Sequence, residues 1–204
     1  MSGKKIYLMR HARPELPNGG GIYYGHLDLP ISDEGRAAAA RVGDYLKDKI
    51  VFDRLYTSDL RRTKETADIV APYLEAEECP ALREINLGEW EGRTFDEVRE
   101  QFKEIYENRG KHYSEIAPPG GENFLELQQR VLPAFDKIAS SCDEGNILII
   151  GHGAAIWSIM SAHFGFNLDH WLFFPQEYCG IHVLEPYCGR FKISRYNWSP
   201  TLTN

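Results

Sequence analysis

The stretch Asn-Ile-Leu-Ile-Ile at residues 146–150 is followed at once by Gly151-His152-Gly153. A short apolar run bounded by turn-forming residues is typical of a buried strand, so we predict a strand that ends just before His152. A second such run, Lys-Lys-Ile-Tyr-Leu-Met at residues 4–9, ends in Arg10-His11. The two stretches predict a buried sheet in which a histidine directly follows two of the strands.

The remaining chain alternates between helical and extended patterns. Ser32 has the position of a helix N-cap, and Ala38, Val42 and Leu46 recur on one helical face after it. The next predicted elements are a strand at 53–57, a helix that follows it to about residue 74, and a short extended piece at 81–85. Helices are then predicted after Thr94, across 127–138 and from about residue 154, and two strands follow at 181–185 and 191–196. Strands that alternate with helices predict an α/β domain, a three-layer α/β/α sandwich with a mainly parallel sheet.

Length and composition narrow the class of protein. The 204 residues suit one compact domain, and 43% of them are hydrophobic, enough for a core without disulfides or structural metal. Lys and Arg number 23 against 30 Asp and Glu, and the formal charge of -7 argues against a nucleic-acid binder. No apolar run reaches the ~20 residues of a membrane span, and the first residues lack the pattern of a signal peptide. We therefore expect a cytoplasmic protein that spans no membrane; the sequence predicts no oligomeric state.

Polar residues gather where the predicted strands end. They are, in chain order, Arg10 and His11, Ser58 with Arg61 and Arg62, Glu84, and His152. Because ligands of open α/β sheets bind beyond the carboxyl ends of the strands, we expect these side chains to converge on one rim. Only one of the two adjacent arginines can point easily into a pocket there, and the spacing favours Arg62. Arginine and histidine gathered in an acidic protein make a positive pocket that suits a phosphoryl group.

The same residue types indicate a reaction. An imidazole among guanidinium groups stays neutral and nucleophilic near pH 7, because its cationic form is disfavoured there. A glutamic acid such as Glu84, kept protonated by the negative charge of the phosphate, can protonate the leaving oxygen. The four cysteines form no CxxC pair and no zinc-ligand spacing with a histidine. We therefore predict phosphoryl transfer through a phosphohistidine on a small-molecule phosphate ester, with no metal and no other cofactor.

Six segments resemble the motifs of the histidine phosphatase superfamily, whose members include cofactor-dependent phosphoglycerate mutases. The family patterns are RHG, GxxDxPL, SxLxRAxQTA, LxExxxGxWEG, PGGES and SHG. The matching segments are, in the same order, residues 8–13 (LMRHAR), 24–32 (YGHLDLPIS), 58–67 (SDLRRTKETA), 82–92 (LREINLGEWEG), 119–123 (PGGEN) and 151–153 (GHG). The resemblance spans nearly the whole chain. It implies a phosphoglycerate mutase-like fold in a single domain, 1–204, with a small cap-like insertion around 93–120.

The resemblance also implies a role for each matching residue. His11 is expected to be the phosphorylated nucleophile, and Glu84 the general acid and later the base that activates water. Arg10, Arg62 and His152 are expected to hold the phosphoryl oxygens. Further substrate contacts are expected from the amide of Gly153 and from the side chains of Asn18, Arg13 and His26.

The chain departs from the family pattern at positions outside the catalytic group. Ala12, Asn123 and Gly151 replace the Gly, Ser and Ser of three motifs, and Ile22 stands where many members have an arginine. Arg13 can partly replace that charge. None of these changes removes a catalytic residue, so we expect the protein to be active.

The choice between phosphatase and mutase depends on the insertion. Mutases of the family carry an added segment between the acid motif and PGGES, and here only residues 93–118 separate the two. The short insertion favours a phosphatase acting on a monoester. The opening RHxRP, with YGxxDxP and GEWEG, is similar to α-ribazole phosphatases, and sugar phosphates or nucleotides are equally compatible with it.

A non-catalytic phosphate- or phosphoprotein-binding module is an alternative of another class. Simple binding needs neither His11 nor Glu84, so the presence of both favours catalysis. A serine hydrolase is excluded, because the chain contains no GxSxG nucleophile elbow.

Overall fold

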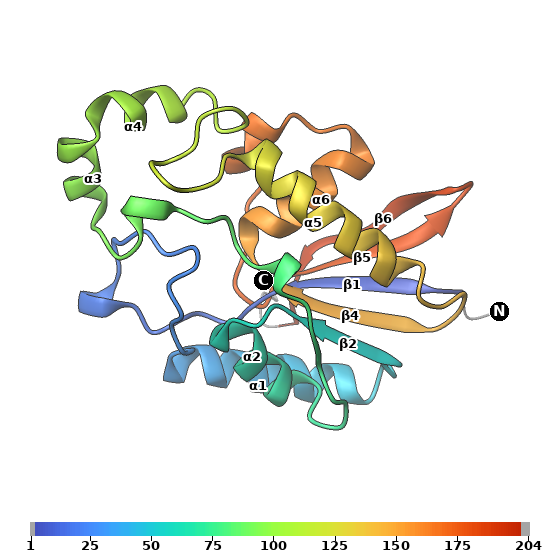
Figure 1. Ribbon diagram of the computed structural model, residues 1–204. Helices are drawn as coiled ribbons and strands as arrows, with labels where there is room; N and C mark the ends of the chain where they lie inside the picture. Colours follow the sequence, from blue (N-terminus) through green and yellow to red (C-terminus); the bar gives the residue numbers. More distant parts are fainter. Residues whose placement is uncertain (1–2, 201–204) are drawn as a thin grey trace.

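The computed structural model describes residues 3–200, with every side chain in this range except that of Asn18. One six-stranded sheet runs through it in the order β3-β2-β4-β1-β5-β6 (Figure 1). The strands are β1 (Lys5–Arg10), β2 (Arg54–Thr57), β3 (Glu77–Glu78), β4 (Asn146–Gly151), β5 (Ile181–Tyr187) and β6 (Arg190–Trp198). Within the described residues β5 alone runs against the other strands, since it is antiparallel to both β1 and β6. The sheet is therefore mainly parallel, as the sequence predicts.

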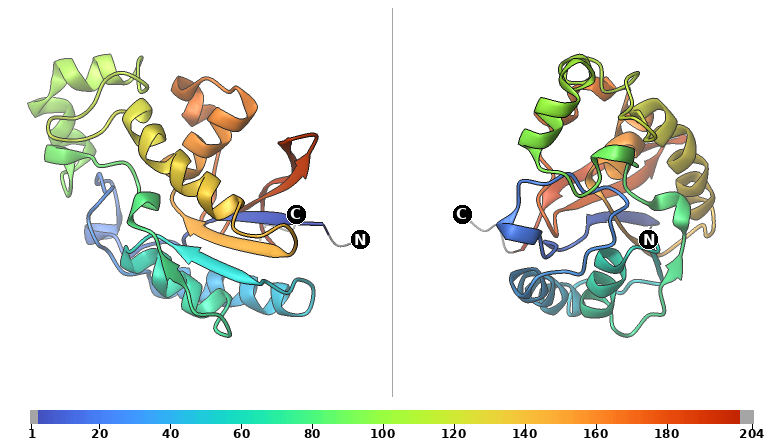
Figure 2. Two further views of the ribbon diagram at one scale, coloured as in Figure 1. Left: turned by 45° about the vertical axis from the view of Figure 1, so that its right-hand side comes forward. Right: turned by 60° about the vertical axis from the view of Figure 1, so that its left-hand side comes forward.

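Helices cover both faces of the sheet. On one face lie α1 (Asp33–Lys47) and α2 (Arg61–Val70), and on the other α5 (Phe124–Ala139) and α6 (Gly153–Phe164) (Figures 1 and 2). These three layers confirm the predicted α/β/α sandwich. Two further helices, α3 (Phe95–Gln101) and α4 (Lys103–Arg109), belong to neither layer and lie to one side of the sheet (Figure 1). Short 3-10 helices are η1 (Pro17–Gly19), η2 (Pro80–Leu82), η3 (Gly88–Trp90) and η4 (Leu168–Phe173). None of the helices in the described residues is long and apolar enough to cross a membrane.

Alternate residues of β1 belong to two hydrophobic cores. Ile6 and Leu8 are buried in the core with residues of α5 and α6. Tyr7 and Met9 are buried in the core with residues of α1 and α2. A strand turns successive side chains to opposite faces, so β1 is packed from both sides and reads as a continuous apolar run. His11, which follows this strand directly, is therefore attached to one of the most tightly packed parts of the chain.

The helices begin where local capping signals place them. The Ser32 side chain accepts a hydrogen bond from the amide of Gly35 and so caps α1. Thr94 and Glu97 form a reciprocal capping box at the start of α3, which confirms that a helix begins after Thr94. Asn123 caps α5 in the same way, so its replacement of the family serine keeps the capping function.

Two local predictions are wrong. The segment at 81–85 is not extended, because it begins within η2 and the short strand β3 lies before it. Pro80 fixes its own φ and has no N–H to donate to a sheet, which favours the 3-10 turn. The helix predicted after Thr94 is divided in two at Phe102, whose φ of -122° and ψ of 33° separate α3 from α4.

Candidate active site

The pairing of β1 with β4 brings two histidines together. The two strands are parallel, and Arg10 on β1 lies opposite Gly151 on β4. The next residues along the chains, His11 and His152, are therefore neighbours, with ring centroids 5.1 Å apart. Both rings are almost fully buried, with exposed fractions of 1% and 0%. Local apolar runs predict each strand end, and the sheet topology decides that the two ends are adjacent.

The hydrogen bonding of His11 determines which ring nitrogen is free. Its Nδ1 lies 2.7 Å from the backbone oxygen of Ala12. A carbonyl can only accept, so Nδ1 carries the proton and Nε2 presents a lone pair. Burial holds the pKa of His11 well below its ordinary value, and the positive charges of Arg62 and Arg10 lower it further. The imidazole is therefore neutral at pH 7.

Arg62 lies on the first turn of α2, and its side chain is fully buried. Hydrogen bonds hold its guanidinium in one position. Its two Nη groups donate to the backbone oxygens of Leu27 at 2.9 Å and Gly25 at 2.6 Å. Its Nε donates to Nδ1 of His152 at 3.3 Å, which leaves the His152 proton on Nε2 for the hydroxyl of Ser58 at 2.7 Å. The guanidinium retains further N–H groups because each Nη carries two.

The neighbouring arginine has a different environment. Arg61 forms an ion pair with Glu65 at 2.9 Å, and half of its side chain is exposed. Its amide donates to a carboxylate oxygen of Asp28. The structure thus brings Arg62, and not Arg61, to the two histidines, as the spacing predicts.

Glu84 lies at the N-terminus of α6. Its carboxylate accepts hydrogen bonds from the amides of Ala154 and Ala155, with Oε1 at 3.1 and 3.2 Å, and from its own neighbour Ile85 at 2.9 Å. The partial positive charge of a helix N-terminus favours a carboxylate there. The prediction that Glu84 ends a strand is wrong, because it follows η2 in a loop. The loop nevertheless carries it to the rim formed by β1 and β4.

Arg10 and Gly153 stand beside Glu84. One Nη of Arg10 donates to the backbone oxygen of Gln176 at 2.5 Å, and the guanidinium lies 4.0 Å from the centre of the Tyr178 ring. Its Nε is buried and has no hydrogen-bond partner among the described residues. A Cβ at Gly153 would lie 3.7 Å from both this Nε and a carboxylate oxygen of Glu84, so the backbone of Gly153 is part of the same group.

The remaining predicted contacts are placed differently. His26 lies at the edge of the group, where its Nε2 is 2.9 Å from the backbone oxygen of Glu84. Arg13 is not brought to the group: its side chain is 54% exposed and lies 3.9 Å from Glu34. Its backbone oxygen accepts from Ser32 at the start of α1, which turns residue 13 toward the surface. Asn18 lies on η1, and its side chain is outside the part of the chain that the structure describes.

A cavity of about 540 Å³ adjoins Arg10, Glu84 and Gly153 and extends to α3 and α4. Aromatic side chains line much of it, namely Tyr23, Tyr24, Phe95, Tyr106, Tyr113, Phe124, Trp171 and Phe174. Trp171 and Phe174 belong to this lining and also pack against the hydrophobic core that contains residues of α5 and α6. Arg99 and Arg109, from α3 and α4, also line it.

Sequence reasoning misses several residues that build this site. Glu91 accepts hydrogen bonds from the amides of Gly25, His26 and Leu27, and it thereby shapes the loop that holds Arg62. Its place in the WEG motif was a signal for this role. Tyr178, which contacts Arg10, carries no comparable signal because it stands in an irregular loop before β5.

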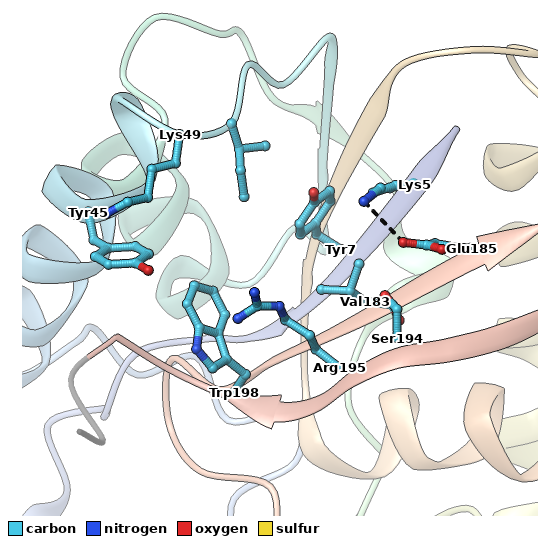
Figure 3. Close-up of a pocket in the computed structure, with 10 residues that line it drawn as sticks. Lys5, Tyr7, Tyr45, Lys49, Val183, Glu185, Ser194, Arg195 and Trp198 are labelled. Carbon is cyan, nitrogen blue, oxygen red and sulfur yellow. Dashed lines mark hydrogen bonds and ion pairs between the residues drawn. The ribbon is translucent and has the colours of Figure 1, made fainter. Parts of the chain in front are cut away.

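A second cavity, of about 350 Å³, is lined by side chains from β1, β5, β6 and the C-terminal part of α1 (Figure 3). Lys49 and Arg195 lie over the rings of Tyr45 and Trp198 there, and Lys5 pairs with Glu185. None of the predicted site residues lines it. Across the described part of the chain, no group of three or more His, Cys, Asp or Glu side chains is arranged to hold a metal ion.

Comparison with known proteins identifies the family of the chain. Residues 6–199 match the family model described as the histidine phosphatase superfamily, branch 1. A putative phosphoserine phosphatase 2 from Hydrogenobacter thermophilus is 31% identical over 87% of this chain and 87% of its own length. A 2,3-bisphosphoglycerate-dependent phosphoglycerate mutase from Parvibaculum lavamentivorans is 34% identical over 76% and 77%. The crystal structure of the alpha-ribazole phosphatase from Shigella flexneri has the same fold, with a TM-score of 0.85 at 23% identity over 95% of this chain and 96% of that one. The chain thus belongs to the histidine phosphatase superfamily, branch 1.

Proposed function

We propose that the protein hydrolyses a small-molecule phosphate monoester through a phosphohistidine on His11, without a metal ion. One observation carries the proposal. His11 presents an unprotonated Nε2, because its Nδ1 proton is bound to the carbonyl of Ala12. Burial lowers the pKa of this imidazole most, and the charges of Arg62 and Arg10 lower it further, so His11 is neutral while the two arginines supply the positive charge that a phosphate needs.

In the first step, Nε2 of His11 attacks the phosphorus. A P–N bond forms as the P–O bond to the alcohol breaks. Glu84, which is protonated when the negatively charged phosphate binds beside it, gives its proton to the leaving oxygen. Arg10 and Arg62 bind the equatorial oxygens, where negative charge is spread in the transition state. His152 joins them when a phosphoryl oxygen replaces the Ser58 hydroxyl as the acceptor of its Nε2 proton. The unpartnered Nε of Arg10 and the free Nη protons of Arg62 are donors for these oxygens.

In the second step, the carboxylate of Glu84 takes a proton from water, and the oxygen attacks phosphorus as the P–N bond breaks. Inorganic phosphate leaves, and His11 returns to its neutral form with Nε2 unprotonated. The amides of Ala154 and Ala155 hold Glu84 in one orientation for both proton transfers. No group other than those of the chain, the ester and water enters the balance.

We place the remaining contacts around this centre. The segment at 93–120, with α3 and α4, acts as a small cap of a single domain, since its side chains line the same cavity as Arg10 and Glu84. Gly153 supplies a further substrate contact from its amide, and His26 one from the edge of the site. A contact from Asn18 stays a prediction, and Arg13 needs a change of side-chain conformation to make one. The cytoplasmic location also stays a prediction.

The substrate is a monoester whose alcohol part enters the aromatic cavity. Its first candidates are α-ribazole 5′-phosphate, whose base is an aromatic ring, and sugar phosphates. The phosphoserine phosphatase name of one relative adds O-phosphoserine to the set.

The test is phosphate release by the purified protein, with and without a chelator. The panel comprises α-ribazole 5′-phosphate, sugar phosphates, O-phosphoserine, 3-phosphoglycerate, nucleoside monophosphates and 4-nitrophenyl phosphate. We expect turnover that is insensitive to the chelator and absent in His11→Ala, while His112→Ala, an exposed histidine, keeps full activity. Chelator-sensitive turnover contradicts the metal-free mechanism. Silence of the natural protein across the panel, equal to His11→Ala, contradicts hydrolysis and favours a binding module.

Phosphoglycerate mutase activity is the alternative that the 34% identical mutase favours. It is tested by following interconversion of 2- and 3-phosphoglycerate with 2,3-bisphosphoglycerate present. Faster interconversion than phosphate release would replace the hydrolase assignment.

A further inference from the structure

Arg109, the last residue of α4, is a buried cation without a counterion. Its exposed fraction is 5%, and its side chain forms no hydrogen bond and no ion pair within the described residues 3–200. It lies instead near aromatic rings, with its guanidinium carbon 5.0 Å from the centre of Tyr113 and 5.6 Å from that of Trp90. Arginine remains charged even when buried, so a positive charge is held here in apolar surroundings.

The other strongly buried arginine differs from Arg109 because its guanidinium has hydrogen-bond acceptors within the chain. Arg62 has three acceptors for its guanidinium. Arg130, which is part-buried, pairs with the carboxylate of Glu122 at 2.7 Å and also donates to backbone oxygens. Burying a charge is costly unless it is paired, so Arg109 stands out as a guanidinium that is free to pair with an anionic ligand.

The position of Arg109 indicates what that partner is. Arg109 lines the cavity of about 540 Å³ that also adjoins Arg10, Glu84 and Gly153. α4 lies apart from the ends of β1 and β4 (Figure 1), so the cavity reaches from the phosphoryl site to the cap segment. A substrate bound to His11 through its phosphate therefore extends its alcohol part toward Arg109.

Charge and geometry favour one kind of group at this end. A single guanidinium neutralises one negative charge, and its planar fork of N–H donors matches the two oxygens of a carboxylate. Tyr23 and Tyr113 lie close enough to interact electrostatically with Arg109, and both line the cavity. Arg99, which pairs with Asp96 at 3.1 Å on the exposed side of α3, adds positive charge to the same wall.

We infer that Arg109 binds a carboxylate on the alcohol part of the substrate, so that the preferred ester carries a carboxylate besides its phosphate. This inference rests on the proposed phosphatase function and narrows its substrates. It places carboxylated esters above α-ribazole 5′-phosphate and above neutral sugar phosphates.

Two pairs of esters that differ only at the carboxylate test the inference. They are 3-phosphoglycerate against glycerol 3-phosphate, and O-phosphoserine against phosphoethanolamine. We expect a higher kcat/KM for the carboxylated member of at least one pair. In Arg109→Met this advantage should fall about 30-fold or more, as loss of one partner of a buried charge pair does. Hydrolysis of 4-nitrophenyl phosphate should remain within about twofold, because that substrate has no carboxylate for Arg109.

Lys103→Met is the matched control, since it removes a positive charge from an exposed position on the same helix outside the cavity. It should leave every ratio unchanged. If neither pair is turned over, inhibition of 4-nitrophenyl phosphate hydrolysis gives the same comparison: 3-phosphoglycerate should inhibit more strongly than glycerol 3-phosphate, and Arg109→Met should remove the difference. Arg109→Lys, which keeps the positive charge, should retain part of the difference between the two compounds.

The outcomes separate the two proposals. An inactive natural protein on 4-nitrophenyl phosphate contradicts the phosphatase function. Normal activity with no carboxylate preference, or an equal loss in Arg109→Met on all substrates, overturns the role of Arg109 alone. If Arg109→Met loses kcat/KM on fructose 1,6-bisphosphate but not on fructose 6-phosphate or on the carboxylated esters, Arg109 binds a second phosphate and not a carboxylate. That result would overturn the inference.

Discussion

The rings of His11 and His152 lie 5.1 Å apart at an interplanar angle of 61°, and each follows the last residue of a different parallel strand. Their strands are far apart in sequence, but β1 and β4 pair directly at the centre of the sheet. Arg62 links them electrostatically, since its charge lowers the pKa of both rings. The pair therefore remains uncharged while two arginines nearby carry the positive charge of the site.

Glu84→Gln tests the proton transfers. The amide keeps acceptor capacity at the start of α6 but cannot give up a proton, so kcat should fall roughly 10²–10⁴-fold on sugar phosphates. The loss should be smaller on 4-nitrophenyl phosphate, whose leaving oxygen needs no proton. The measurement is kcat on both substrates. An equal loss on both would show that Glu84 does not act as the acid.

The adjacent arginines offer a comparison within one turn of helix. Arg62→Lys loses the planar fork that reaches Gly25, Leu27 and His152 at once, so kcat/KM should fall at least about 100-fold. Arg61→Lys should stay within about twofold, because it changes a surface ion pair with Glu65. Steady-state kinetics on 4-nitrophenyl phosphate decide between them. A similar loss of kcat/KM in both variants would show that the substitutions disturb helix α2 in general, and it would contradict a specific role for Arg62.

The low pKa of His11 has a consequence for the pH profile. A nucleophile whose pKa is held well below 6.5 is unprotonated where an ordinary histidine titrates, so kcat/KM should not decline there on the acid side. We expect the acid limb that belongs to His11 well below pH 6.5. A rate profile from pH 4 to 9 measures it, and a decline centred at 6.5 would show that the imidazole is not shielded as described.

Stability should also depend on pH through buried neutral histidines. Burial lowers the pKa of His182 to about 4, so below pH 6.5 the unfolded chain binds a proton that the folded chain does not. The free energy of unfolding should therefore fall as the pH drops from 6.5 toward 4, by up to about 3 kcal/mol for this residue. Urea unfolding at several pH values measures the slope. His182→Gln should make it shallower, whereas His112→Gln, at an exposed position, should leave it unchanged.

Glu91 links stability to activity. Its carboxylate accepts from the amides of Gly25, His26 and Leu27, so Glu91→Gln leaves donors of this loop without full acceptors. We expect a loss of about 1–3 kcal/mol in the free energy of unfolding. The loss of kcat/KM should accompany it, because the same loop holds Arg62. Glu89→Gln, an exposed residue of the same motif, is the control and should resemble the natural protein in both measurements.

Local signals predict much of the fold and the core of the site. Apolar runs bounded by turns identify β1 and β4, and capping residues such as Ser32 and Thr94 mark helix starts, because these signals depend on neighbours in sequence. Arg62 is preferred to Arg61 on spacing alone, and the structure agrees. The error at Glu84 has a local cause as well, since Pro80 favours a 3-10 turn that the extended pattern conceals.

The sequence by itself determined the residue types at the strand ends and the alternation of strands and helices, since both follow from short-range hydrophobic and backbone preferences. Only the tertiary structure decided that β1 and β4 are neighbours, that Arg13 faces Glu34, and that Arg109 from α4 lines the same cavity as Arg10. These relations join segments that are distant along the chain. The positions of these residues depend on how the layers pack and on which buried groups find partners. A local sequence pattern specifies neither of these.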